Sequence, residues 1–118
     1  MHQDDFSFEI TNDVIVEKIH FTRATQKESN IFKGRLDKYL LLKYYKIIID
    51  LSDCSFIDST FLGVMVVSLK KVFEKGGEIK FVINNDALMK TIKDIKLDRV
   101  FNIYQTKTDA LKSFEDHF

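Results

Sequence analysis

The segment from Lys46 to Gly63 most constrains what this chain can fold into. It reads KIIIDLSDCSFIDSTFLG. Residues 45–51 contain consecutive aliphatic residues, Ile47 to Ile49, without polar alternation, which is typical of a strand that helices cover on both faces. Residues 55–57 continue in extended backbone, and residues 58–60 (Asp-Ser-Thr) favour the N-cap or first turn of a helix. The pattern predicts an α/β fold in which a buried strand leads into a helix, with ligands or partners acting at the carboxyl edge of the sheet.

The rest of the chain alternates strands and helices. Thr25 and Glu28 have the spacing of a capping box, and Gly76-Gly77 provides a helix stop. Strands are predicted at 6–10, 14–19, 45–51, 78–83 and 100–104, and helices at 26–43, 59–75, 86–94 and from 106 onward. We therefore predict one domain over residues 1–118, with an N-terminal hairpin, a mixed and mostly parallel sheet, and about four helices.

The overall composition excludes several classes of protein. The chain has 118 residues, and its 18 basic residues balance its 18 acidic ones. Without a basic cluster, nucleic-acid binding is disfavoured, because that binding depends on neutralising phosphates. No apolar run is long enough to cross a bilayer and the N-terminus has no signal-peptide pattern, so we expect no membrane partner and a cytoplasmic location. The single cysteine, Cys54, lies among apolar residues and is expected to be a small buried residue.

Catalytic chemistry has little support in the sequence. His2, His20 and His117 lack metal-ligand spacing, and no glycine-rich phosphate loop is present. Three acidic residues, Asp50, Asp53 and Asp58, lie close together, as in phosphate-accepting receiver domains, but the second acidic pair and the downstream lysine of those domains are missing. The sequence therefore predicts a protein that is not an enzyme and has no cofactor or metal. A nucleotide-binding or enzymatic role remains a hypothesis beside the two binding functions described below.

Ser59 has two interpretations. Its hydroxyl lies at the start of a predicted helix, so it can simply cap that helix. It is also placed at the sheet edge, where a partner's active site can modify it. A phosphate there would add about −1.5 to −2 charges. From position alone, both interpretations remain open.

The helix that follows Ser59 carries two apolar stripes. The predicted core stripe comprises Leu62, Val66, Leu69 and Phe73. The second comprises Phe61, Val64, Val67 and Ser68, and leads to Lys71. A helix that is apolar on most sides is either sandwiched between neighbours or offers a patch to a partner, and the pattern fits both.

At these residues the chain resembles a STAS domain, the module shared by sulphate transporters and bacterial anti-sigma factor antagonists. The family motif Asp-Ser-[Ser/Thr]-Gly-Leu-Gly corresponds to residues 58–63 (DSTFLG). The resemblance continues through Gly76-Gly77 and residues 97–104, and covers about 44–114 well.

The resemblance implies a regulatory binding protein with a phosphorylation switch. Ser59 is the expected phospho-acceptor, Asp58 its orienting neighbour and Thr60 a weaker acceptor. The expected partners are a serine kinase that is itself the anti-sigma factor and a metal-dependent serine phosphatase. The predicted partner surface comprises Asp53, Phe61, Val64, Val67, Ser68 and Lys71.

This sequence departs from the family pattern at four positions. Phe61 replaces the motif glycine, and Lys96 stands where many members have glycine. Arg23 and Gln26 occupy the glycine and aspartate positions of a Gly-Glu-Leu-Asp segment in which the aspartate usually lies near the acceptor serine. The alternative function is therefore a STAS module that docks constitutively through Phe61, Val64 and Val67 without phosphorylation.

Overall fold

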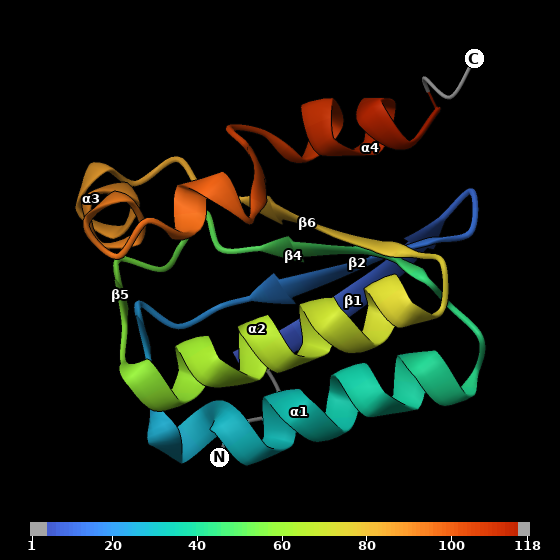
Figure 1. The fold of residues 1–118 in the computed structure, drawn as a ribbon, viewed down its shortest axis with the longest axis horizontal. Helices are drawn as coiled ribbons and strands as arrows, with labels where there is room; N and C mark the ends of the chain where they lie inside the picture. The colour runs from blue at the N-terminus through green and yellow to red at the C-terminus, as the bar shows by residue number, and fades with distance from the viewer. Residues whose placement is uncertain (1–4, 116–118) are drawn as a thin grey trace.

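The computed structural model describes residues 5–115 and shows the predicted α/β domain (Figure 1). A five-stranded sheet has the order β1-β2-β4-β6-β7, and a two-stranded sheet pairs β3 with β5. The strands are β1 (Phe6–Thr11), β2 (Val14–Ile19), β3 (Arg23–Ala24), β4 (Lys46–Asp50), β5 (Phe56–Ile57), β6 (Glu78–Val82) and β7 (Asn102–Tyr104). The helices are α1 (Gln26–Leu41), α2 (Ser59–Glu74), α3 (Asp86–Asp94), the short 3₁₀ helix η2 (Leu97–Arg99) and α4 (Lys107–Glu115).

The N-terminal hairpin forms as the sequence predicts. Strands β1 and β2 are antiparallel, whereas β2, β4, β6 and β7 pair in parallel. Asn12 and Asp13 connect the hairpin strands with φ values of 50° and 68°. Positive φ at both loop residues belongs to a two-residue turn whose twist matches that of the flanking strands, and Asn and Asp tolerate this conformation.

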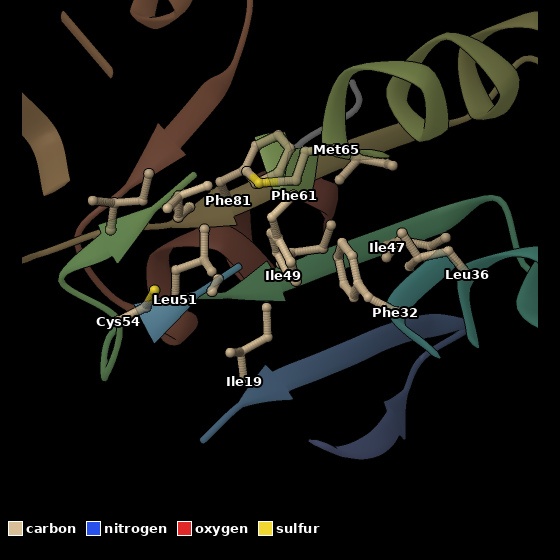
Figure 2. Close-up of a cluster of buried hydrophobic side chains, with 14 of the residues drawn as sticks. Ile19, Phe32, Leu36, Ile47, Ile49, Leu51, Cys54, Phe61, Met65 and Phe81 are labelled. Carbon is tan, nitrogen blue, oxygen red and sulfur yellow. The ribbon is translucent and has the colours of Figure 1, made fainter. Parts of the chain in front are cut away.

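Helices cover both faces of the sheet. Figure 1 shows α1 and α2 side by side on one face, α4 on the opposite face and α3 beyond the end of the strands. On β4, Ile47 and Ile49 belong to the larger core cluster with α1 and α2, while Ile48 belongs to the cluster that contains Phe114 of α4. This burial on both faces explains the unbroken apolar run of the sequence. Figure 2 shows Ile47 and Ile49 near Phe32.

The predicted core stripe of α2 is wrong by one residue. The buried side chains are Phe61, Met65, Ser68 and Val72 instead of Leu62, Val66, Leu69 and Phe73. Phe73 is 75% exposed. Apolar residues lie on most sides of this helix, so their period could not select one face. The face that is buried is the one that carries Phe61, because Phe61 packs against Phe32 of α1 and against Phe21, which follows β2.

The pairing of β3 with β5 was not predicted. Each strand has two residues, too few for a periodic pattern. Their parallel register places Arg23 beside Phe56 and Ala24 beside Ile57. The pairing therefore brings the segment before α1 next to the segment before α2.

Other boundaries differ locally. The last strand begins at Asn102 instead of Val100, because residues 97–99 form η2. Lys96 precedes η2 with φ 64°, a left-handed conformation that explains why a glycine suits this position. The stop after α2 is confirmed, with Gly76 at φ 80°. None of the helices in residues 5–115 combines the length and apolarity needed to span a membrane.

Candidate functional site

Asp58 is the N-cap residue of α2, and Ser59 is the first residue of the helix. The Asp58 carboxylate accepts a hydrogen bond from the backbone N–H of Phe61 at 2.9 Å through Oδ1. A side chain that accepts from the third helical N–H performs the capping role. The interpretation in which Ser59 caps the helix is therefore wrong. The Ser59 side chain is exposed, as is that of Thr60.

Asp58 also connects the N-termini of two helices. Its Oδ2 accepts a hydrogen bond from the backbone N–H of Gln26, the first residue of α1, at 2.8 Å. Its own N–H donates to the carbonyl of Ala24 at 3.0 Å. Two backbone donors thus share one carboxylate, in positions where helix dipoles favour negative charge. The backbone next to Ser59 is therefore held from both sides.

The two departures at residues 23 and 26 lie at this site. Gln26 contributes its backbone N–H to Asp58, a contact that any non-proline residue can make. The Arg23 guanidinium lies over the ring of Phe56, 4.0 Å from its centroid. Arg23 is exposed and pairs with Phe56, three residues before Ser59.

The three neighbouring carboxylates do not converge. Asp50 and Asp53 lie 3.6 and 3.5 Å from Lys18 Nζ, respectively. Asp50 also accepts a hydrogen bond from the N–H of Ser52 at 3.0 Å. Asp58 is occupied by the two helix N-termini. Across residues 5–115, no three side chains of the His, Cys, Asp or Glu types gather as a metal-binding group.

Two residues of the predicted partner surface lie inside the protein. Phe61 is 0% exposed, and its ring stacks on Phe32 with 4.6 Å between centroids (Figure 2). It also meets Phe21 edge to face at 6.2 Å. Ser68 lies on the same face of α2 as Phe61 and is also buried. The prediction that the Phe61 ring lies on the surface beside the acceptor is therefore wrong, because Phe32 of α1 and Phe21 pack against it.

The remaining predicted surface residues are accessible to different degrees. Asp53 and Val67 are exposed, whereas Val64 and Lys71 are half-buried. Lys71 Nζ lies 3.3 Å from Asp37 Oδ1 and so links α2 to α1. Four of the six residues of the predicted partner surface are therefore accessible, and two of these four only in part.

One face of α2 is exposed along its length. Ser59, Gly63, Val67 and Lys70 follow each other at helical spacing and are all exposed, and we call this set the α2 outer face. A Cβ built on Gly63 would meet no atom within 4 Å, so the surface is open directly below Ser59. Sequence reasoning missed Gly63 and Lys70, although counting four residues on from Ser59 finds the first of them.

Two other potentially nucleophilic side chains, those of Cys54 and His20, are hydrogen-bonded within the protein. Cys54 is buried as predicted, and burial raises the pKa of its thiol, which donates to the Phe56 carbonyl at 3.3 Å. His20 is exposed and its Nε2 lies 2.7 Å from the Ser7 hydroxyl. The other two histidines, His2 and His117, lie outside the described residues.

Comparison with known proteins places the chain in a family. The STAS domain model matches residues 9–110. A Thermotoga neapolitana protein assigned by name to the anti-sigma factor antagonists is 34% identical over 93% of this chain and 97% of its own length. A Thermotoga maritima protein of the same assignment is 33% identical over 91% of this chain and 95% of its own length.

Solved structures agree with this assignment. The crystal structure of a Thermotoga maritima anti-sigma factor antagonist superposes with a TM-score of 0.82 at 31% identity and covers 92% of both chains. Phosphorylated SpoIIAA, a Bacillus cell fate determinant, shares the fold alone, with a TM-score of 0.72 at 15% identity over 92% of this chain and 98% of its own. This chain therefore belongs to the STAS domain family, among its anti-sigma factor antagonists.

Proposed function

We propose that this protein is an anti-sigma factor antagonist switched by reversible phosphorylation of Ser59. The observation that carries the proposal is the exposed hydroxyl of Ser59 at the first position of α2, next to a carboxylate that already caps the helix. The hydroxyl is thus free of a structural role in the helix start. An accessible hydroxyl on a rigid backbone is a suitable substrate for a serine kinase, because little ordering is needed on binding.

A phosphate on Ser59 would act mainly on the partner. The N–H groups of Phe61 and Gln26 are taken by Asp58, so they cannot hold the phosphate. The dipole of α2 favours the added charge by about 0.3–1 kcal/mol, while Asp58 opposes it. The two effects roughly cancel, so the domain keeps its fold. A protein packed over Ser59 would have to desolvate a group of about −1.5 to −2 charges, which is strongly unfavourable.

The α2 outer face is the proposed docking surface for the kinase. A protein that reaches Ser59 also passes over Gly63 and Val67, and Val67 is 49% exposed. Asp53, Thr60, Val64 and Lys71 flank this face. In the proposed cycle the unphosphorylated protein binds a kinase that is also the anti-sigma factor, and so frees the sigma factor. A metal-dependent serine phosphatase restores the unphosphorylated form.

The proposal is tested by phosphate uptake. Each serine-kinase anti-sigma factor encoded in the same genome is incubated with this protein, ATP and Mg²⁺, and the intact mass and modified residue are determined. We expect one phosphate on Ser59 and none in Ser59→Ala. Thr60→Ala is the matched control and should be phosphorylated normally. Uptake that persists in Ser59→Ala would refute the assignment.

The same experiment separates the constitutive alternative. A module that docks without modification would bind its kinase with equal affinity in wild type and Ser59→Ala, yet take up no phosphate. Its binding would depend on Val67, so Val67→Asp should abolish it. The structure removes Phe61 from the contact residues of this alternative, because its ring is in the core.

Gly63 provides a second prediction. Gly63→Gln should raise the free energy of unfolding by about 0.5–1 kcal/mol, because glycine is a poor helix former and the site is open. The long side chain should also lower the rate of Ser59 phosphorylation about tenfold or more, because it sterically hinders the kinase that docks on the α2 outer face. Gly34→Gln is the matched control: Gly34 is an exposed, open glycine within α1. It should stabilise similarly and leave phosphorylation unchanged. Equal phosphorylation of both variants would contradict docking on the α2 outer face.

A further inference from the structure

The outer edge of β1 is unpaired. β1 is the first strand of the sheet, with β2 on one side and, within residues 5–115, no strand on the other. Thr11 and Val14 flank the two-residue turn and therefore exchange hydrogen bonds. Because such pairs alternate along an antiparallel ladder, the N–H and C=O groups of Phe6, Phe8 and Ile10 point away from β2, to the free edge.

The side chains on this edge are unusually apolar. Phe8 is 55% and Ile10 is 50% exposed, and both lie on the face that α1 covers. Beside them is a groove of about 210 Å³, lined by Ile15, Tyr39, Leu42 and Tyr44 among others. A long, apolar, unpaired edge strand invites pairing with another strand, and soluble proteins normally protect such edges.

The apolar surface continues onto α1. Arg35 and Lys38 of α1, together with Leu42 just past the end of the helix, lie beside Phe8 and Ile10 of β1. Arg35 lies over the ring of Phe6, and Leu42 lines the groove. Leu42 is exposed, as is Ile31 one helical turn before Arg35. The strand edge and the helix together form one surface.

We propose that a second copy of this chain occupies this surface, through antiparallel two-fold pairing of β1 centred on Phe8. In this register Phe8 lies opposite the partner's Phe8, and Phe6 lies opposite the partner's Ile10. All three of these residues have outward-pointing backbone groups, so each pair exchanges hydrogen bonds. Their side chains lie on the same face, so the dimer joins two apolar patches into one.

Charge and side-chain pairing favour this register over its neighbours. Centring on Glu9 would place two carboxylates opposite each other, which is unfavourable. Centring on Phe8 places Glu9 opposite the partner's Ser7, and each Glu9 keeps its own Lys107 at 2.7 Å on the other face of the sheet.

The two ends of the edge are complementary. Asp5 precedes β1 at one end, where the cation near Phe6, Arg35, is already paired with the Glu17 carboxylate. At the other end Lys38 lines the groove with Ile10, and Lys43 lines the neighbouring pocket with Asp13, so lysines outnumber the one carboxylate there. Antiparallel pairing brings the Asp5 end of each copy beside the lysine end of the other. This self-complementarity is the reason to assign a second copy of the chain, and not a foreign peptide, to the surface.

The first test is the mass of the particle in solution. Wild type should sediment as a dimer that dissociates on dilution, and Ile10→Lys should be monomeric at the same concentrations. Phe73→Lys replaces an even more exposed apolar residue, which lies on α2 away from the β1 edge, so this variant should remain dimeric. A wild type that stays monomeric up to millimolar concentration would overturn the proposal.

The second test fixes the register and does not depend on the lysine variant folding. Under mild oxidation Phe8→Cys should form a covalent dimer, since each new thiol faces its own copy within disulfide range. Ile10→Cys should not, because it faces Phe6 of the partner subunit. Cys54 is buried and does not compete. Equal cross-linking of both variants would overturn the Phe8-centred register. The proposed dimer uses no residue of the α2 outer face and stands or falls independently of Ser59 phosphorylation.

Discussion

Replacement of Phe61 by alanine is expected to lower the free energy of unfolding by about 3–5 kcal/mol. The ring is fully buried, stacks on Phe32 and meets Phe21 edge to face, so its removal leaves a cavity where α1 meets α2. Urea denaturation followed by circular dichroism measures the change. Phe73→Ala, on the exposed side of the same helix, is the matched control and should change stability by less than about 0.5 kcal/mol.

The result bears on how binding data are interpreted. A Phe61 variant that fails to bind a kinase will have lost folded protein and not a contact residue. If Phe61→Ala were as stable as Phe73→Ala, the ring would not be in the core and the first interpretation of the sequence, an exposed aromatic patch, would be restored. Phe61→Gly, which recreates the family motif, should be more destabilising still, because glycine is a poor helix former.

Replacement of Arg35 by methionine is expected to cost about 3–5 kcal/mol. Glu17 is fully buried on β2, and Arg35 binds both of its carboxylate oxygens, with Nη2 to Oε1 at 2.8 Å. Tyr39 donates its hydroxyl to the same Oε1 at 2.6 Å. Removing Arg35 leaves a buried carboxylate without its cation. The exposed pair of Lys33 and Asp37 supplies the control, because Lys33→Met should cost less than about 1 kcal/mol.

The pH dependence of this variant has a definite sign. The hydrogen bond with Glu17 raises the pKa of Arg35, and burial followed by the Glu17 hydrogen bond raises the pKa of Tyr39, so both of these side chains keep their protons through neutral pH. In Arg35→Met the Glu17 carboxylate stays fully buried but loses its cation, and burial disfavours the charged form of a carboxyl group. The stability of the variant should therefore be greatest at acid pH, where the neutral carboxyl form is favoured, and should fall as the pH rises towards neutral.

Chemical denaturation at about pH 4 and pH 7 measures this dependence. The destabilisation of Arg35→Met relative to wild type should be smaller at the acid pH. The double variant Glu17→Met/Arg35→Met should recover most of the stability, because two apolar side chains replace a buried ion pair. A deficit of the single variant that does not change with pH would show that Glu17 is not an uncompensated charge.

Local signals in the sequence were sufficient for the elements around the candidate site. The apolar run of residues 45–51 predicted a strand buried on both faces, and Asp58, Ser59 and Thr60 predicted the helix start. These signals depend on nearest neighbours and on a short period, so a single sequence contains them. The family motif then directed attention to Ser59.

The side of α2 that faces the core was decided only by the tertiary structure. The sequence offered two apolar stripes, and Phe61 faces inward because the rings of Phe32 and Phe21 complete its packing. Those partners come from distant parts of the chain. Packing between them is a property of three-dimensional shape, which a periodic pattern does not encode.

The structure of residues 46–63 was therefore predictable in part from the sequence and was decided in part by the folded chain. Its strand and the start of its helix at residues 58–60 follow from the residues themselves, whereas the choice of Asp58 as the cap was made by the structure. Three further features required the folded chain: the bond from Gln26 to Asp58, the stack of Arg23 on Phe56, and the exposed row from Ser59 to Lys70. Each joins segments far apart in sequence, or depends on which face is covered, so only the closure of β3 on β5 and of α1 on α2 determines it.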